Sequence, residues 1–304
     1  MQSIEYAASR LHCSVGGSAL KPNDEFRKQP KSFWATVRLV SQVLGYTEPR
    51  TGRLRTPSFK AIAGALASVG LNPEHVLETE EVGNSLGLLL ESYFVYRAHV
   101  LYDLVRPALM TEAGARGEFE RVRQTLSRGC PLPMNKQKGP KRAPAYFTCI
   151  INILLTEALA GLPCDFDPRK LTTITRDAVP LRTLARRVDG AFPSPINPIA
   201  VWEIKEYYYT TTFGSRVADG VYESLLDGLE LEELRENEGV DVLHYLMVDA
   251  YETWWNDGKS YLCRMVDMLH MEYVDEVLFG REVLERLPKI ALEWRRRFTG
   301  ISTS

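Results

Sequence analysis

Three residues in the middle of the chain have the types and spacing that could support phosphodiester hydrolysis. Asp189 precedes Glu203 by fourteen positions, and Glu203 and Lys205 lie two apart in the apolar run IAVWEIKEYYY. Charges inside a buried strand are costly unless they are paired or bind a metal. Because side chains alternate along a strand, Glu203 and Lys205 would share one face, about 6.5 Å apart along the chain. Two carboxylates and one ammonium could then converge at a sheet edge.

This combination of groups suits magnesium-assisted chemistry. Two carboxylates with open water positions are the usual way to hold Mg²⁺ in a protein. The ion can contact a phosphodiester oxygen and acidify a bound water, and a neighbouring lysine can stabilise the negative transition state. We therefore predict Asp189 and Glu203 as catalytic metal ligands and Lys205 as a catalytic residue beside them.

The elements around these residues indicate a mixed sheet flanked by helices. The segment PSPINP contains three prolines and suits a turn that joins two adjacent strands, so that Asp189 can come beside Glu203. From the pattern we expect a helix over 144–162, one strand or perhaps two over 181–192, a strand over 197–213, a helix over 214–236, a strand over 242–251 and helices over 261–297.

On these residues the chain resembles the PD-(D/E)XK nuclease superfamily, which has the restriction-endonuclease-like fold. VDGAF followed by WEIK is similar to the family's D…(D/E)-x-K core, although Val188 stands where proline often occurs. The resemblance covers about residues 144 to 252. It implies a helix before the first strand that often carries an acid, a place that Glu157 occupies, and a helix and a strand after Lys205.

The resemblance implies a Mg²⁺-dependent endonuclease that acts on double-stranded DNA, as a restriction or phage-defence enzyme. The alternative from another class is a DNA-binding or assembly module that keeps the fold without the chemistry. At the level of the residues, the competing interpretation is a Glu–Lys pair on the solvated face of an edge strand, which is common in antiparallel sheets. The aromatic neighbours of Glu203 favour the buried site.

Basic loops are the candidate DNA contacts, because arginine and lysine bind phosphates and arginine also reads guanine edges. The competing interpretation is ordinary solvated loops. An equally open alternative for Arg216 is that it simply begins a helix. Likewise, Trp254 and Trp255 could stack on bases, but such a pair more often fills a core. The predicted contacts are Arg50, Arg53, Arg55, Lys136, Lys138, Lys141, Arg142 and Arg216.

The part before the Pro-, Gly- and Lys-rich connector at 130–143 is expected to be helical. We divide the chain into a helical N-terminal region, residues 1–130, and a nuclease core with C-terminal helices, residues 131–304. The periodicity predicts helices in KSFWATVRLVSQVLGY, in the segment that begins at Pro57, in residues 85–109 and in EFERVRQTLSRG. A helix that starts at Pro57, just after the arginine loop, could read bases or could be a packing scaffold.

Composition and motifs limit which other functions and locations the sequence allows. The formal net charge of the 304 residues is −2, so bulk charge predicts no polyanion partner. The five cysteines are scattered and lack CxxC spacing, which argues against a zinc site or a disulfide framework. There is no P-loop or GxGxxG fingerprint, no signal region and no apolar run long enough for a bilayer, so we expect a cytoplasmic protein without a nucleotide cofactor. The apolar periodicity of residues 261–279 and the needs of double-strand cleavage predict a homodimer.

Overall fold

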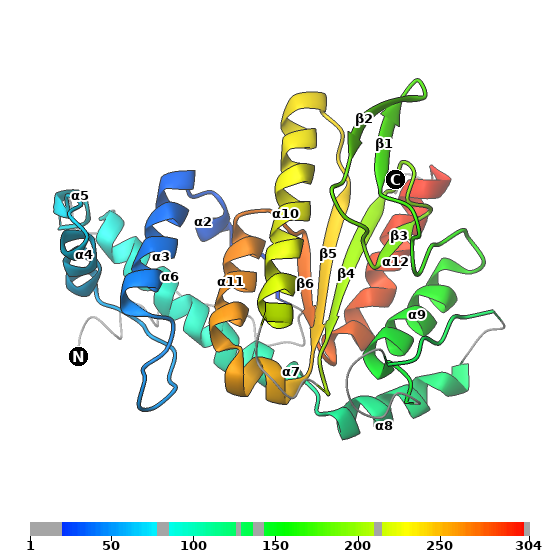
Figure 1. Ribbon diagram of the computed structural model, residues 1–304, viewed down its shortest axis with the longest axis horizontal. Coiled ribbons are helices and arrows are strands. Elements are labelled where there is room, and N and C mark those ends of the chain that lie inside the picture. Colours follow the sequence, from blue (N-terminus) through cyan, green and yellow to red (C-terminus); the bar gives the residue numbers. More distant parts are fainter. Residues whose placement is uncertain (1–19, 78–84, 126–128, 136–142, 210–214, 301–304) are drawn as a thin grey trace.

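A mixed four-stranded sheet forms the centre of the computed structural model (Figure 1). The structure describes residues 20–77, 85–125, 129–135, 143–209 and 215–300. The strand order is β3-β4-β5-β6, in which β3 (Gly190–Phe192) runs antiparallel to β4 (Ala200–Glu206). β4, β5 (Leu243–Asp249) and β6 (Glu276–Phe279) are parallel to one another. The α/β class and the mixed sheet are thus confirmed.

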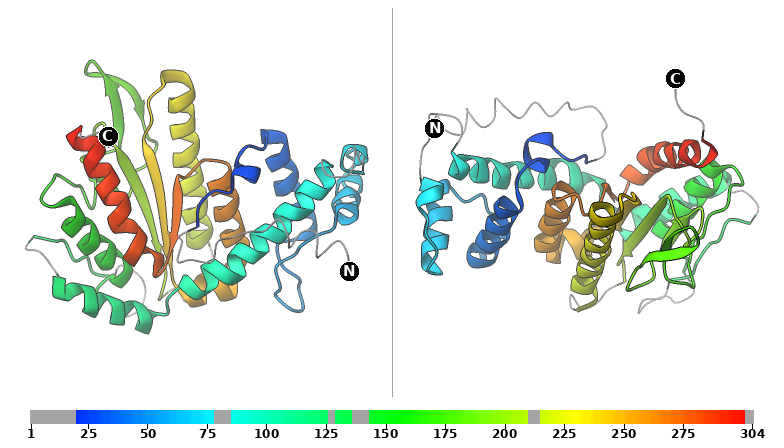
Figure 2. Two further views of the ribbon diagram at one scale, coloured as in Figure 1. Left: turned by 180° about the vertical axis from the view of Figure 1, so that it is seen from behind. Right: turned by 90° about the horizontal axis from the view of Figure 1, so that it is seen from above.

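Helices cover both faces of this sheet. On one face lie α9 (Tyr146–Leu159) and α12 (Glu282–Thr299), which pack on each other and on the apolar side chains of β4. The opposite face carries α10 (Ser215–Glu238) and α11 (Lys259–His270), and Figure 2 shows the two layers from above. Because α10 connects the parallel strands β4 and β5, it crosses directly over the side of β4 that bears the candidate site.

Most of the remaining helices, α2 to α7, form an extension beside α11. They pack with α11 and with one face of β5 and β6 in a continuous apolar core, and α6 runs along this assembly (Figures 1 and 2). By contrast, α8 and η2 pack against α9, in the layer on the other face of the sheet. The bounds of all these helices are α2 (Asp24–Arg27), α3 (Lys31–Leu44), α4 (Phe59–Ser68), α5 (Glu74–Leu77), α6 (Leu86–Val100), the π-helix η1 (Leu101–Val105), α7 (Arg106–Ala108), α8 (Glu112–Val122) and the 3₁₀-helix η2 (Arg123–Thr125). The helical character predicted for the first part of the chain is confirmed over these ranges.

Local sequence explains where these helices begin and end. Ser58 is the N-cap of α4 and accepts a hydrogen bond from the amide of Ala61, so the helix starts two residues after Pro57 rather than at it. At the other end Gly70 has φ +77°, and the amides that follow the helix bond back to its last carbonyls. Glycine adopts this left-handed conformation without steric cost, which closes the helix.

Two strand regions differ from the sequence expectation. The residues after α11 were expected to be helical, but Glu276–Phe279 form β6, because a short apolar run buried on both faces shows no period that separates strand from helix. A separate hairpin, β1 (Thr173–Arg176) with β2 (Val179–Thr183), was not expected before β3 and β4. The strand predicted over 181–192 is divided between β2 and β3, and β4 ends at Glu206, earlier than predicted.

Within the described ranges, no helix has both the length and the apolar character that crossing a lipid bilayer requires.

Candidate active site

Glu203 and Lys205 meet on one face of β4, as their spacing predicts. Lys205 Nζ donates to Glu203 Oε2 at 2.7 Å, and the two residues are 4% and 0% exposed respectively. The intervening residue and Trp202 point to the other face, where the indole of Trp202 stacks on Trp294 at 5.5 Å. The strand therefore separates a charged face from an apolar one, and the charged pair lies within the protein rather than on a solvated edge.

Asp189, directly before the start of β3, is joined to the same strand. Its amide donates to the carbonyl of Trp202 (3.1 Å) and to Glu203 Oε1 (3.2 Å), and its Oδ2 accepts from the amide of Ile204 (2.8 Å). The next residue, Gly190, lies against Trp202, where an added Cβ would come within 2.0 Å of the ring. Glycine at that position allows β3 to approach β4 closely enough for these bonds.

Arg186, which the sequence analysis did not single out, lies at the centre of the cluster. Its guanidinium donates to both oxygens of Glu203, at 2.9 and 3.1 Å, and to Asp227 Oδ2 at 2.6 Å. It also reaches Glu223 Oε2 at 3.3 Å. A planar guanidinium suits this forked contact, because its donors match a carboxylate geometry. The only sequence signal was its position three residues before Asp189.

Two further acids come from α10. Glu223 and Asp227 are four residues apart and so share one side of the helix. Glu223 is half-buried and accepts from Lys205 Nζ at 3.1 Å. Gly220, one turn earlier, leaves room for this approach: an added Cβ would lie 2.7 Å from the Tyr207 hydroxyl and 3.2 Å from Lys205 Cδ.

Four carboxyl groups face two cations in this cluster, and the pKa values follow from that imbalance. Burial raises the pKa of Asp227 to about 7, with the charge of Glu203 as the next cause. The pKa of Asp189 is also raised, to about 6, first by burial of its carboxyl group and then by the charge of Glu203. The residue as a whole is exposed, so water and ions reach it and screen its charge. Burial would raise the pKa of Glu203, but Lys205 and Arg186 outweigh it and hold that pKa below its ordinary value.

Asp189 and Glu203 would be the residues that hold a Mg²⁺ ion here, as two carboxylates completed by water rather than a closed protein cage. Among the described residues, no three or more His, Cys, Asp or Glu side chains are grouped so as to hold a metal ion. Asp189 and Glu203 are nevertheless adjacent, and the buried Oδ1 of Asp227 has no hydrogen-bond partner in the described part of the chain. Mg²⁺ needs only one or two carboxylates, so the excess negative charge here suits it.

The other predicted catalytic residue, Glu157, is not brought to this cluster. It is exposed on α9, in the layer across the sheet from Lys205. Burial is the main reason why the pKa of the Cys130 thiol is raised, and the charge of Glu157 raises it further.

The three arginines of the loop before α4, Arg50, Arg53 and Arg55, lie in three different environments. Arg55 Nε donates to the carbonyl of Thr47 (3.2 Å) and so stabilises the loop itself. Arg50 is exposed, and Arg53 lines a cavity between the loop and η1. The remaining predicted DNA contacts lie outside the residues that the structure describes: Lys136, Lys138, Lys141 and Arg142, together with the side chain of Arg216.

The surface on which the dimer prediction rested is buried within the chain. The apolar side chains of α11 pack against α6 and the sheet, and those of β6 lie in the interior. The apolar periodicity of residues 261–279 therefore reflects the fold of one chain and is no argument for a partner. The homodimer itself stays a prediction.

Comparison with protein families places the candidate site in one matched region. Residues 110–294 match the model of the family described as Domain of unknown function (DUF7687), and the chain belongs to that family. Residues 20–104 match a second model, described as Domain of unknown function (DUF7690). Neither the curated proteins nor the solved structures give a match. The six clustered side chains all lie in the first region, and the predicted boundary near residue 130 stays a prediction.

Proposed function

We propose that this member of the DUF7687 family is a metal-dependent endonuclease that hydrolyses DNA phosphodiester bonds, in restriction or phage defence. The observation that carries the proposal is the junction of Asp189, Glu203 and Lys205. Lys205 Nζ lies 2.7 Å from Glu203 Oε2, and Asp189 bonds to the backbone of the same strand at Ile204. Acid, acid and lysine thus come together from two neighbouring strands, as the resemblance to PD-(D/E)XK nucleases implies.

The order of elements supports the same proposal. A helix (α9) precedes antiparallel β3 and β4, and α10 then leads to β5, parallel to β4. This is the succession expected of a restriction-endonuclease-like core, into which the hairpin of β1 and β2 is inserted. We propose that fold for residues 144 to 252.

In this proposal each side chain has a distinct role. Mg²⁺, when bound by Asp189 and Glu203, would supply Lewis-acid chemistry at the scissile phosphate. Lys205, whose pKa the neighbouring carboxylates Glu203 and Asp189 raise against the effect of burial, stays protonated and can stabilise negative charge on that phosphate. Arg186 orients Glu203 through its two bonds and keeps Asp227 paired.

A nicking assay on supercoiled plasmid tests the proposal with the full chain. We expect cleavage with Mg²⁺ or Mn²⁺, none with EDTA, and loss of cleavage in Glu203→Gln and Lys205→Met. Glu206→Gln is the matched control: Glu206 is on the same strand but on the other face, where it accepts bonds from Thr148 at the start of α9. Unchanged cleavage in both site variants would remove the assignment.

One observation favours the alternative, a DNA-binding or assembly module without catalysis. Both oxygens of Glu203 are already bonded to Arg186 and Lys205, so the cluster can be stable as an ion-pair network alone. In that case duplex DNA binds equally well to the native protein and to Glu203→Gln, no divalent ion shifts the melting temperature, and no cleavage is seen under any condition.

A further inference from the structure

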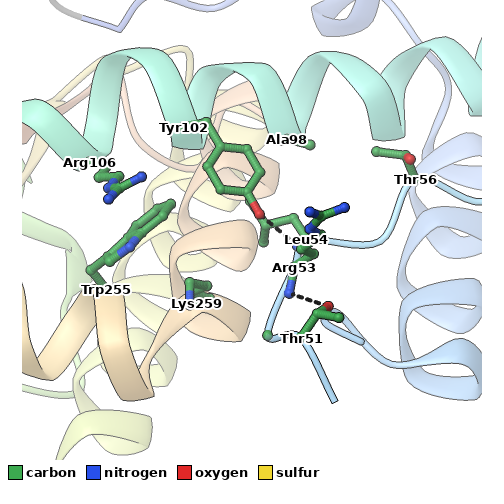
Figure 3. Close-up of a pocket in the computed structure, with 10 residues that line it drawn as sticks. Thr51, Arg53, Leu54, Thr56, Ala98, Tyr102, Arg106, Trp255 and Lys259 are labelled. Atoms are coloured by element: carbon green, nitrogen blue, oxygen red, sulfur yellow. Dashed lines mark hydrogen bonds between the residues drawn. The ribbon is translucent and has the colours of Figure 1, made fainter. Parts of the chain in front are cut away.

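A second group of cations surrounds a cavity that is distinct from the candidate active site. The cavity has a volume of about 520 Å³ and lies where the loop before α4 meets η1 and the start of α11 (Figure 3). Arg53 comes from the loop, Arg106 from α7 directly after η1, and Lys259 from α11, while Tyr102 and Trp255 complete the walls. We call this the Trp255 pocket. A volume of this size lies within the about 300–1,000 Å³ of typical small-molecule sites.

An aromatic ring orders two of the three cations. Lys259 Nζ lies 5.1 Å from the centre of the Trp255 ring, and the guanidinium carbon of Arg106 lies 5.4 Å from it. Trp255 is itself held by an edge contact with Tyr102 at 5.5 Å and is 5% exposed. Cation–π attraction fixes these charges beside the cavity. The indole therefore positions cations and is not free to stack on a base.

Within the described residues, no ion pair involves the three cations of the Trp255 pocket, Arg53, Arg106 and Lys259. Two acids of the neighbouring segments have other partners: Glu48 accepts from the hydroxyl of Thr51 at 2.6 Å, and Asp103 faces His99 at 2.5 Å. Like charges that converge without a counter-ion repel one another, and an anion in the cavity would relieve this repulsion.

Irregular helices build the walls and connect them to the candidate active strand. Tyr102 lies in the π-helix η1, and Trp255 lies in the second π-helix, η3 (Glu252–Asp257). Such turns are rare and often occur at functional sites. In η3 the indole of Trp254 donates to the carbonyl of Lys205 at 3.4 Å. One short segment thus contacts both the Trp255 pocket and the backbone of β4.

From these contacts we infer that the Trp255 pocket binds the phosphate of a nucleotide or of a nucleic-acid strand. Arginine and lysine together suit a phosphate, since the guanidinium donates in pairs and the ammonium acts as a point charge. The inference goes beyond the proposed nuclease activity and does not depend on it, because phosphate binding here requires none of the clustered carboxylates.

Equilibrium binding to the full chain, in EDTA, tests this inference with four probes: inorganic phosphate, adenosine monophosphate, a short single strand and the matching duplex. The test variant is Arg106→Gln with Lys259→Gln. Its matched control, Lys289→Gln with Arg296→Gln, removes the same charge from exposed positions on α12. We expect binding of at least one probe to weaken roughly tenfold or more in the test variant, and to stay within about twofold in the control.

The probe that responds identifies the source of the phosphate. Weakened adenosine monophosphate binding indicates a free nucleotide. Weakened strand binding alone indicates the nucleic-acid backbone, and the slope of log affinity against log salt should then fall by about 2 for the duplex. A charge-conserving variant, Arg106→Lys with Lys259→Arg, should retain most of the binding. No binding of any probe to the native protein, or equal losses in test and control variants, would overturn the inference. Failure of cleavage with normal binding would count against the nuclease alone.

Discussion

Replacing Glu203 by glutamine should destabilise the protein strongly while keeping the shape of the side chain. Glu203 is fully buried and is the shared partner of Lys205 at 2.7 Å and of Arg186 at 2.9 and 3.1 Å. Removing one member of a buried ion pair costs about 3–5 kcal/mol, because the remaining charge is left without compensation. Glutamine keeps one acceptor oxygen, and Glu223 still contacts both cations, so we expect about 3 kcal/mol.

Urea unfolding followed by circular dichroism measures this loss. Since the free energy of unfolding falls by about 1–3 kcal/mol per molar urea, the midpoint should fall by about 1–3 M. The control Glu206→Gln should move it by less, because Glu206 accepts hydrogen bonds from the neutral amide and hydroxyl of Thr148, and burial raises its pKa to about 7, so that it is partly protonated near neutrality.

The pH dependence of the difference between native protein and Glu203→Gln provides a second check. The folded-state pKa of Glu203 is below the ordinary value of 4.5, so its contribution is fully present above that value and is lost as pH falls through the folded pKa. The difference should therefore be constant near neutrality and shrink in acid. A loss under about 1 kcal/mol at neutral pH, or one that grows in acid, would refute the ion-pair account of this cluster.

Three further predictions follow from single contacts. Added Mg²⁺ should raise the melting temperature more at about pH 8 than at about pH 5.5. The reason is that Asp227, with a pKa of about 7, is mostly ionised at the higher pH and mostly protonated at the lower one, and its charge attracts the ion; an equal rise at both pH values would contradict this. Gly190→Ala should lower stability by about 1–3 kcal/mol or more in thermal melts and abolish nicking, because its Cβ would meet the ring of Trp202 at 2.0 Å; a native-like melt would show that β3 can shift freely. Asp267→Asn should cost about 3–5 kcal/mol in urea unfolding, because it leaves buried Arg97 without its 3.0 Å partner; a loss under about 1 kcal/mol would contradict that role.

The sequence by itself determined the pairing of Glu203 with Lys205 and the apolar character of the opposite face. Strand alternation is a local property: with Trp202 apolar and the two charged residues two apart, a strand must place both charges on one side. The prolines between Asp189 and Glu203 were also sufficient to predict a turn between two adjacent strands, which the structure shows to be antiparallel. For the same reason the amphipathic helices of the N-terminal part were predictable, since their apolar period is carried by neighbouring residues.

Only the tertiary structure decided which other groups join the site and which stay away. Arg186 lies in an irregular segment with no period, and Asp227 comes from a helix that reaches Glu203 only because α10 crosses back over β4. Glu157 had a suitable position in the sequence, but α9 packs on the far face of the sheet. The segment at Glu276 became a strand because β5 offered its free edge. In each case the deciding contact joins residues distant in the chain, and local pattern carries no information about such contacts.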